Sequence, residues 1–166
     1  MWGEPISHSS RVLSISNHRL PGASKVLEAN TLAREHTNQA TAIREMFDSW
    51  AAAVRAEDFD GIRAHHSPDM LMFDVPLPLF SRGIDAYMDT WKLFYKSQAR
   101  PVVFNFDDIE ITAGEDVAFV TAIGHCLYIP PGAVPTKLQF RLTMGLRKED
   151  SQWRIVHEHH SVPAEE

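Results

Sequence analysis

Asp74 is the first residue in this sequence whose type and position could do chemistry. It follows the apolar run Met70-Leu-Met-Phe73 and precedes the proline-rich stretch Val75 to Phe80. Prolines remove backbone donors, so a strand should end at Asp74 and a loop or a sheet edge should follow. A carboxylate at the end of a buried strand is expected where that strand meets the mouth of a pocket. The alternative is a turn residue that accepts hydrogen bonds from loop amides.

Histidines in the C-terminal segment supply further candidates. His157 and His159 are two residues apart in a predicted strand, so they share one face with Trp153 and Ile155. His-x-His is a spacing found among metal ligands, but the sequence places no third ligand, and we predict no metal. His157 is a candidate catalytic acid and His159 a candidate pocket wall residue. A histidine-rich subunit interface is the alternative for both.

Two more ionisable residues lie within predicted strands. His125 is in the middle of a long strand, where it is either an acid–base group in a pocket or a core histidine with a satisfied hydrogen bond. Arg141 interrupts an alternating apolar segment, Leu138 to Met144. It makes either a surface ion pair or a contact inside a cavity, where a guanidinium could hold a carboxylate or an enolate.

Three helices are predicted to position these residues. One starts near Thr37 and carries an apolar stripe at three- and four-residue steps. Asp58 is a suitable N-cap for a short second helix that ends near His65. A third helix spans roughly residues 84–97 and has one broad apolar side. The stripe of the first helix consists of Ile43, Met46, Phe47, Trp50, Ala51 and Val54.

After Pro101 the pattern changes to the two-residue alternation that is typical of strands. Strands are predicted at residues 102–111, 117–129, 137–147 and 153–161, in addition to the short run that ends at Asp74. Consecutive strands joined by short turns form an antiparallel meander, and the earlier helices must cover one of its faces. The predicted fold class is therefore α+β.

The first 36 residues differ from the rest of the chain. They mix Ser, His, Asn, Pro and Gly with short apolar pieces and show no sustained period. We interpret residues 1–36 as an extended or disordered N-terminal arm, with docking on a partner subunit as the alternative. Residues 37–163 are predicted to form the single domain of the chain.

The element order and two local motifs resemble a known superfamily. One motif is Phe73-Asp-Val-Pro76, followed by Arg82-Gly83, and the other is Arg141-Leu-Thr143, followed by the segment Trp153 to Ser161. Together they resemble the nuclear transport factor 2-like superfamily, in its SnoaL-like and ketosteroid-isomerase-like branch, over about residues 37–163. The final segment also resembles the association domain of calmodulin-dependent kinase.

This resemblance implies a cone, also described as cystatin-like, in which a curved antiparallel sheet wraps around the N-terminal helices. It further implies a cofactor-free enzyme that moves a proton next to a carbonyl, as an isomerase, a polyketide-cyclase-like enzyme or a dehydratase. Asp74 would be the base, His125 or His157 the acid, and Arg141 the anion stabiliser. The ketosteroid isomerases also use a tyrosine on the first helix, where this chain has Phe47 and Trp50. A non-catalytic module that binds a hydrophobic ligand or assembles subunits is the alternative.

The resemblance also implies an apolar pocket for a small hydrophobic molecule. Its expected lining residues are Phe47, Trp50, Phe73, Tyr87, Trp91, Tyr128 and His159.

Composition limits the partners that the chain can have. The net charge of −6 argues against nucleic acid and anionic membranes as partners. The single cysteine, Cys126, excludes an internal disulfide framework. We expect a cytoplasmic protein without a cofactor, since the sequence has no long apolar span and no signal-peptide pattern. We also expect a homodimer, because the convex face of the meander would otherwise expose apolar residues such as Val120 and Phe104.

Overall fold

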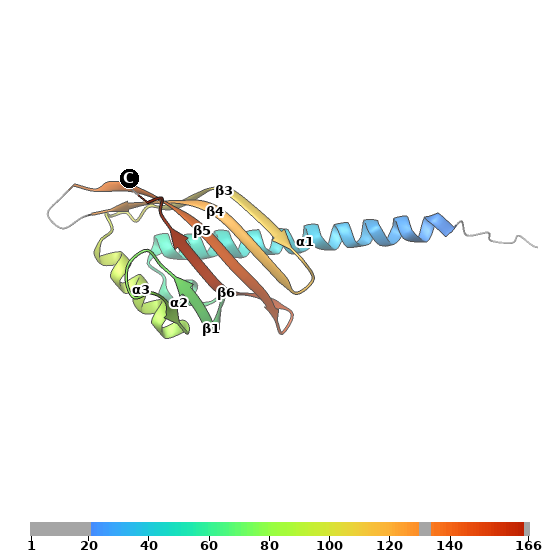
Figure 1. Cartoon of the computed structure of the whole chain (residues 1–166), viewed down its shortest axis with the longest axis horizontal. Helices are drawn as coiled ribbons and strands as arrows, with labels where there is room; N and C mark the ends of the chain where they lie inside the picture. Colours follow the sequence, from blue (N-terminus) through green and yellow to red (C-terminus); the bar gives the residue numbers. More distant parts are fainter. Residues whose placement is uncertain (1–20, 130–133, 165–166) are drawn as a thin grey trace, which may run out of the picture. The chain divides into compact units, whose positions relative to one another are not determined.

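The computed structural model describes residues 21–129 and 134–164 (Figure 1). The chain divides into two compact units, of which the second, Arg34–Glu166, contains all the strands. Its helices are α1 (Pro21–Ala56, which begins in the first unit), α2 (Phe59–Arg63) and α3 (Ile84–Lys96). Within the described ranges, no helix is both long enough and apolar enough to cross a membrane.

Helix α1 begins earlier than the sequence pattern predicts. Residues 21–36 belong to this helix, so the interpretation of an extended arm is wrong for them, and residues 1–20 lie outside the described residues. Residues 25–38 are exposed, which explains why they show no apolar period. The predicted apolar stripe from Ile43 to Val54 is buried, as expected for one face of an amphipathic helix.

Six strands form one curved sheet in the order β2-β1-β6-β5-β4-β3. The pairings are antiparallel except for β1 with β6, which run parallel. α3 and four strands, β2 to β5, separate β1 from β6 in the chain, so no tight turn forces these two strands to run antiparallel. The α+β class and the curved sheet are confirmed. The strands are β1 (His66–Phe73), β2 (Ser81–Arg82), β3 (Phe104–Ala113), β4 (Val117–Tyr128), β5 (Thr136–Glu149) and β6 (Gln152–Ser161).

The core fills the concave side of the sheet with aromatic side chains. Trp50 on α1 contacts Trp91 on α3 and Phe104 on β3, with ring centroids 6.0 and 5.3 Å apart. Phe104 and Val120 are both almost fully buried there. They therefore do not lie on the convex face, and the argument for a dimer that used them is wrong. The outward residues of β4 are instead its odd-numbered ones, such as Val117 and Phe119.

A β-bulge in β6 decides which of its side chains face inward. Leu146 pairs with Ile155, whereas the preceding residue of β5, Gly145, pairs with His157. Val156 is therefore an extra residue, and the side-chain alternation changes phase at this point. As a result Ile155 and Glu158 are both fully buried on the inner face, although they are three residues apart.

Candidate active site

A cavity of about 480 Å³ opens between α3, the Asp74–Pro78 loop and the inner face of the sheet. Its wall is mostly apolar, which suits a small hydrophobic molecule. Trp91 and Phe94 of α3 form one side, and Phe104 and Phe140 of the sheet form the other. Its polar lining residues are Asp74, Ser81, Thr90, Ser97, Gln98, Tyr128 and His160.

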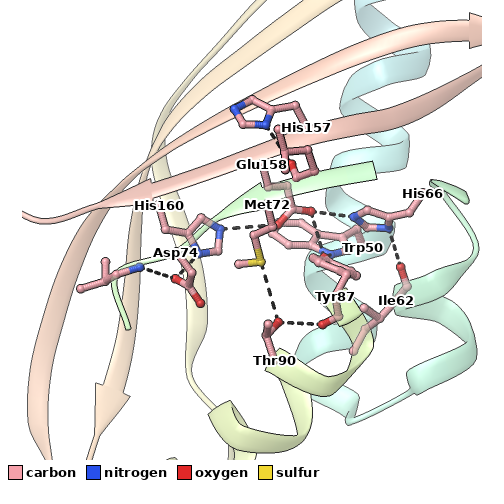
Figure 2. Close-up of polar contacts among 12 residues, drawn as sticks. Trp50, Ile62, His66, Met72, Asp74, Tyr87, Thr90, His157, Glu158 and His160 are labelled. Carbon is pink, nitrogen blue, oxygen red and sulfur yellow. Dashed lines mark hydrogen bonds and ion pairs between the residues drawn. The ribbon is translucent and has the colours of Figure 1, made fainter. Parts of the chain in front are cut away.

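Asp74 and His160 form an ion pair at the cavity wall (Figure 2). The Nδ1 atom of His160 lies 3.3 Å from Oδ1 of Asp74. The backbone N–H of Val75 donates to the same carboxylate oxygen at 2.8 Å, which fixes the orientation of the group. Among the described residues, no hydrogen bond is made to the other oxygen, Oδ2. One oxygen of a positioned carboxylate is thus left for a ligand.

Behind this pair lies Glu158, a carboxylate with no exposed surface. Its Oε2 atom is 3.5 Å from Nε2 of His160, an ion-pair contact that is longer than a good hydrogen bond. Its Oε1 atom accepts from the hydroxyl of Tyr87 at 2.9 Å and faces Nε2 of His66 at 2.6 Å. Trp50 in turn donates from Nε1 to the Tyr87 hydroxyl at 3.2 Å (Figure 2). A polar chain therefore runs from the cavity into the core.

Burial and ion pairing act in opposite directions on these groups. Burial by itself would lower the pKa of His160, but the contacts with Asp74 and Glu158 outweigh it and raise the pKa to about 9. Burial would likewise raise the pKa of Glu158, but the contacts with His160 and His66 lower it to about 2. Both results follow from opposite charges that share a weakly solvated site. At neutral pH His160 is therefore an imidazolium, and it lies next to Asp74 in the cavity wall.

Asp74 lies in the cavity wall, where the sequence predicted it. Its histidine partner there is His160 and not the predicted His157 or His125. His157 and His159 lie on the outer face of β6, where the ring of Phe73 contacts both imidazoles. None of the three lines the cavity, so their predicted place in its wall is corrected. The bulge at Val156 is the physical reason, because it moves His160 to the inner face.

His125 and Arg141 also face outward. His125 has Nε2 2.9 Å from a carboxylate oxygen of Asp107 and lies beside Gln139. Arg141 is exposed on β5, on the face opposite its buried neighbours. Neither residue lines the cavity, so neither can act there as acid or anion stabiliser. Strand alternation places both side chains with the solvent-facing set.

Of the predicted lining residues, Trp91 and Tyr128 do line the cavity. Phe47, Trp50 and Tyr87 are instead part of the solid core beside it. The core needs their bulk to fill the space between α1, α3 and the sheet. We did not predict His160 or Glu158 as site residues from the sequence. The signal for them was the adjacent apolar pair Ile155 and Val156, which indicates a break in the two-residue alternation of the strand.

No group of three or more His, Cys, Asp or Glu side chains that could hold a metal ion occurs in residues 21–129 and 134–164. The sole cysteine, Cys126, lines the cavity, and burial and then the nearby Asp74 charge raise its pKa to about 11. It is therefore a neutral thiol at neutral pH. The acid–base groups of this wall are Asp74 and His160.

A family model for the SnoaL-like domain matches residues 43–165, which include every strand and the whole cavity wall. The chain belongs to the SnoaL-like domain family. No curated protein sequence matches this SnoaL-like chain. The matched segment excludes the first unit, residues 1–33.

Solved structures resemble this SnoaL-like protein over most of its length. A nuclear transport factor 2-like protein of unknown function from Pseudomonas putida is 29% identical, with a TM-score of 0.70 over 78% of this chain and 89% of its own. A proposed scytalone dehydratase from Novosphingobium aromaticivorans is 17% identical, with a TM-score of 0.67 over 77% and 86%. A ketosteroid isomerase-like protein from Erwinia carotovora atroseptica is 16% identical, with a TM-score of 0.63 over 75% and 98%. The last two likenesses show the fold alone.

Proposed function

We propose that this protein is a cofactor-free acid–base enzyme that moves a proton next to a carbonyl group of a small, largely apolar molecule. The observation that carries the proposal is the Asp74–His160 ion pair in the wall of an apolar cavity. A proposed scytalone dehydratase and a ketosteroid isomerase-like protein share the fold, and this likeness supports the reaction class without specifying the substrate.

Asp74 is the base in this proposal. Oδ1 is held by the Val75 N–H and by His160, so Oδ2 is the oxygen that would take the proton from the carbon next to the carbonyl. The carboxylate is partly shielded from water, which leaves it less solvated than a surface aspartate. A fixed carboxylate facing an apolar wall meets the geometric requirement for a general base.

His160 supplies positive charge where negative charge develops. Removing the proton turns the carbonyl oxygen into an enolate oxygen, and a nearby imidazolium stabilises that charge strongly in a weakly solvated site. The pKa of about 9 keeps His160 cationic at neutral pH. Return of the proton to a different carbon would complete an isomerisation. If a hydroxyl group on the neighbouring carbon takes this proton from Asp74 and leaves as water, the reaction is a dehydration.

Proton exchange tests the step that all these reactions share. In D₂O, the wild type should speed deuterium uptake next to the carbonyl of at least one ketone among cyclohexanone, acetophenone and benzylacetone, followed by NMR. Asp74→Asn should lower that rate at least about 100-fold, because it removes the base. His160→Gln should lower it by a smaller factor, because it removes only the charge.

Asp89→Asn is the matched control, since Asp89 lies on the exposed side of α3, paired with Lys92. It should leave the exchange rate unchanged. Equal exchange by Asp74→Asn and wild type would show that the base is wrongly assigned.

A non-catalytic carrier of hydrophobic ligands is the second candidate function. The observation that favours it is the large share of apolar groups in the cavity wall, such as Trp91, Phe94 and Leu138. A wild type that binds these ketones but exchanges no proton in any of them would favour the carrier over the enzyme.

A further inference from the structure

Gln98 lies two residues after the end of α3 and lines the same cavity. Its exposed fraction is 7%, and its Oε1 atom has no hydrogen-bond partner within the part of the chain that the structure describes. A buried acceptor without a partner is costly, so such an atom calls for a donor from outside the protein. Neither the base nor its histidine partner uses this group.

Strand pairing places Gln98 and His160 toward opposite ends of the cavity. His160 pairs with Leu142, which pairs with Ala122 of β4. Gln98 instead forms a bridge with Tyr128, at the far end of β4. At about 3.3 Å per residue, this separates the two backbone positions by roughly 20 Å along the strand.

The wall between the two ends is apolar. Phe104, Leu138 and Phe140 line it, together with the neutral thiol of Cys126. A ligand that touches both ends must therefore be elongated, with an apolar middle and one polar group at each end. A charged group at the Gln98 end would lose its hydration without gaining a counter-ion from these lining residues.

We propose that Oε1 of Gln98 accepts a hydrogen bond from a neutral hydroxyl or amide N–H of the substrate, at the end remote from the reacting carbonyl. Gln98 is then the residue that selects hydroxylated over unsubstituted ligands. The orientation of the substrate in the cavity rests on the proposed function, because Asp74 and His160 define the end that holds the carbonyl. The hydrogen bond to Gln98 requires only that the molecule binds in the cavity.

Benzylacetone and its para-hydroxy derivative form the test pair, since they differ only by a hydroxyl at the end remote from the ketone. Their Kd values are measured by isothermal titration calorimetry. The hydroxylated ketone should bind the wild type at least about tenfold more tightly, because only it satisfies the buried acceptor. Gln98→Met has similar length and no acceptor, so it should abolish that advantage and change the Kd of benzylacetone by less than about twofold.

Two further variants separate recognition from packing. Gln98→Glu keeps an acceptor at the same place and should retain the preference for the hydroxylated ketone. Leu138→Met is the matched control in the same wall and should retain it as well.

An equal preference in wild type and Gln98→Met would overturn the proposal, as would the absence of any preference in wild type. Failure of both ketones to bind the wild type would overturn it too. Asp74→Asn distinguishes the two proposals, because it should lose proton exchange while keeping the preference for the hydroxyl. Exchange without any hydroxyl preference would leave the proposed function standing and Gln98 without a role in selection.

Discussion

His160 contacts both the cavity wall and the buried core. One ring nitrogen faces Asp74 in the cavity wall, and the other faces Glu158 in the interior. Removing either carboxylate would leave this imidazolium with less compensation in a buried site, which is unfavourable. The same contact that orients Asp74 for chemistry therefore also helps to hold β6 against β1.

The two shifted pKa values predict how stability depends on pH. The pKa of His160 is about 9 in the folded protein against an ordinary 6.5, so its contribution is complete below about pH 6.5 and is lost as the pH rises through 9. The pKa of Glu158 is about 2 against 4.5, so its contribution is complete above about pH 4.5 and is lost as the pH falls toward 2. The combined contribution of these two groups to the free energy of unfolding should therefore be greatest between about pH 4.5 and 6.5.

Urea unfolding at a series of pH values measures this profile. The loss in the free energy of unfolding between pH 6.5 and 9 should be on the order of a few kcal/mol. His160→Gln should flatten that alkaline limb, because the titrating group is gone. An identical alkaline slope in wild type and His160→Gln would contradict the assignment.

At the scale of the elements, close packing between β4 and β5 shapes the cavity wall. Gly124 on β4 pairs directly with Phe140 on β5, and the ring of Phe140 occupies the space where a side chain would stand. A Cβ added at Gly124 would lie 2.2 Å from Cζ of Phe140, which is far inside contact distance. Glycine at this position therefore allows Phe140 to lie flat over the strand and line the cavity.

Gly124→Ala should displace the Phe140 ring and destabilise the protein by about 1–3 kcal/mol, the usual cost of overpacking a core. The displaced ring should also weaken binding of benzylacetone. Urea unfolding and calorimetry measure the two effects.

Gly145→Ala on β5 is the matched control, because its added Cβ would lie 3.4 Å from the nearest atom, Cβ of His157. It should cost less stability and leave binding unchanged. Equal losses in both variants would show that the contact with Phe140 does not shape the cavity.

At the scale of the whole molecule, the outer face of the sheet differs from the inner one. Within the second unit, α2, α3 and the C-terminal part of α1 all lie on the inner side (Figure 1). The outer side keeps exposed apolar residues, among them Val117, Phe119 and Phe73. A contiguous exposed apolar patch on one face of a sheet is typical of a protein–protein contact.

We predict a homodimer that forms through this outer face. Light scattering after size exclusion should give twice the 18.8 kDa mass of one chain. Phe119→Glu should shift the protein toward monomer, because it places a charge in the contact. Leu77→Glu, on the exposed loop after β1, should leave the mass unchanged. A wild type that is monomeric at all concentrations would contradict this prediction.

Most helices and strands, and one end of the site, could be predicted from the amino-acid sequence alone. The buried stripe of α1, the Asp58 N-cap, which accepts a hydrogen bond from the Gly61 amide, and the four long strands match the structure closely. β1 ends at Phe73, directly before Asp74, as the prolines that follow predict, and Asp74 lines the cavity. These features depend on near neighbours in the chain, so local periodicity and capping suffice to find them.

The residues that contact Asp74 could not be predicted in this way, because they depend on how the strands pair. The bulge at Val156 depends on how β6 pairs with β5, and it moves His160 and Glu158 inward while His157 and His159 turn outward. The partnerless acceptor of Gln98 depends on which strand end meets the end of α3. Contacts between residues far apart in the chain set both features, and a two-residue alternation read along one strand contains no information about them.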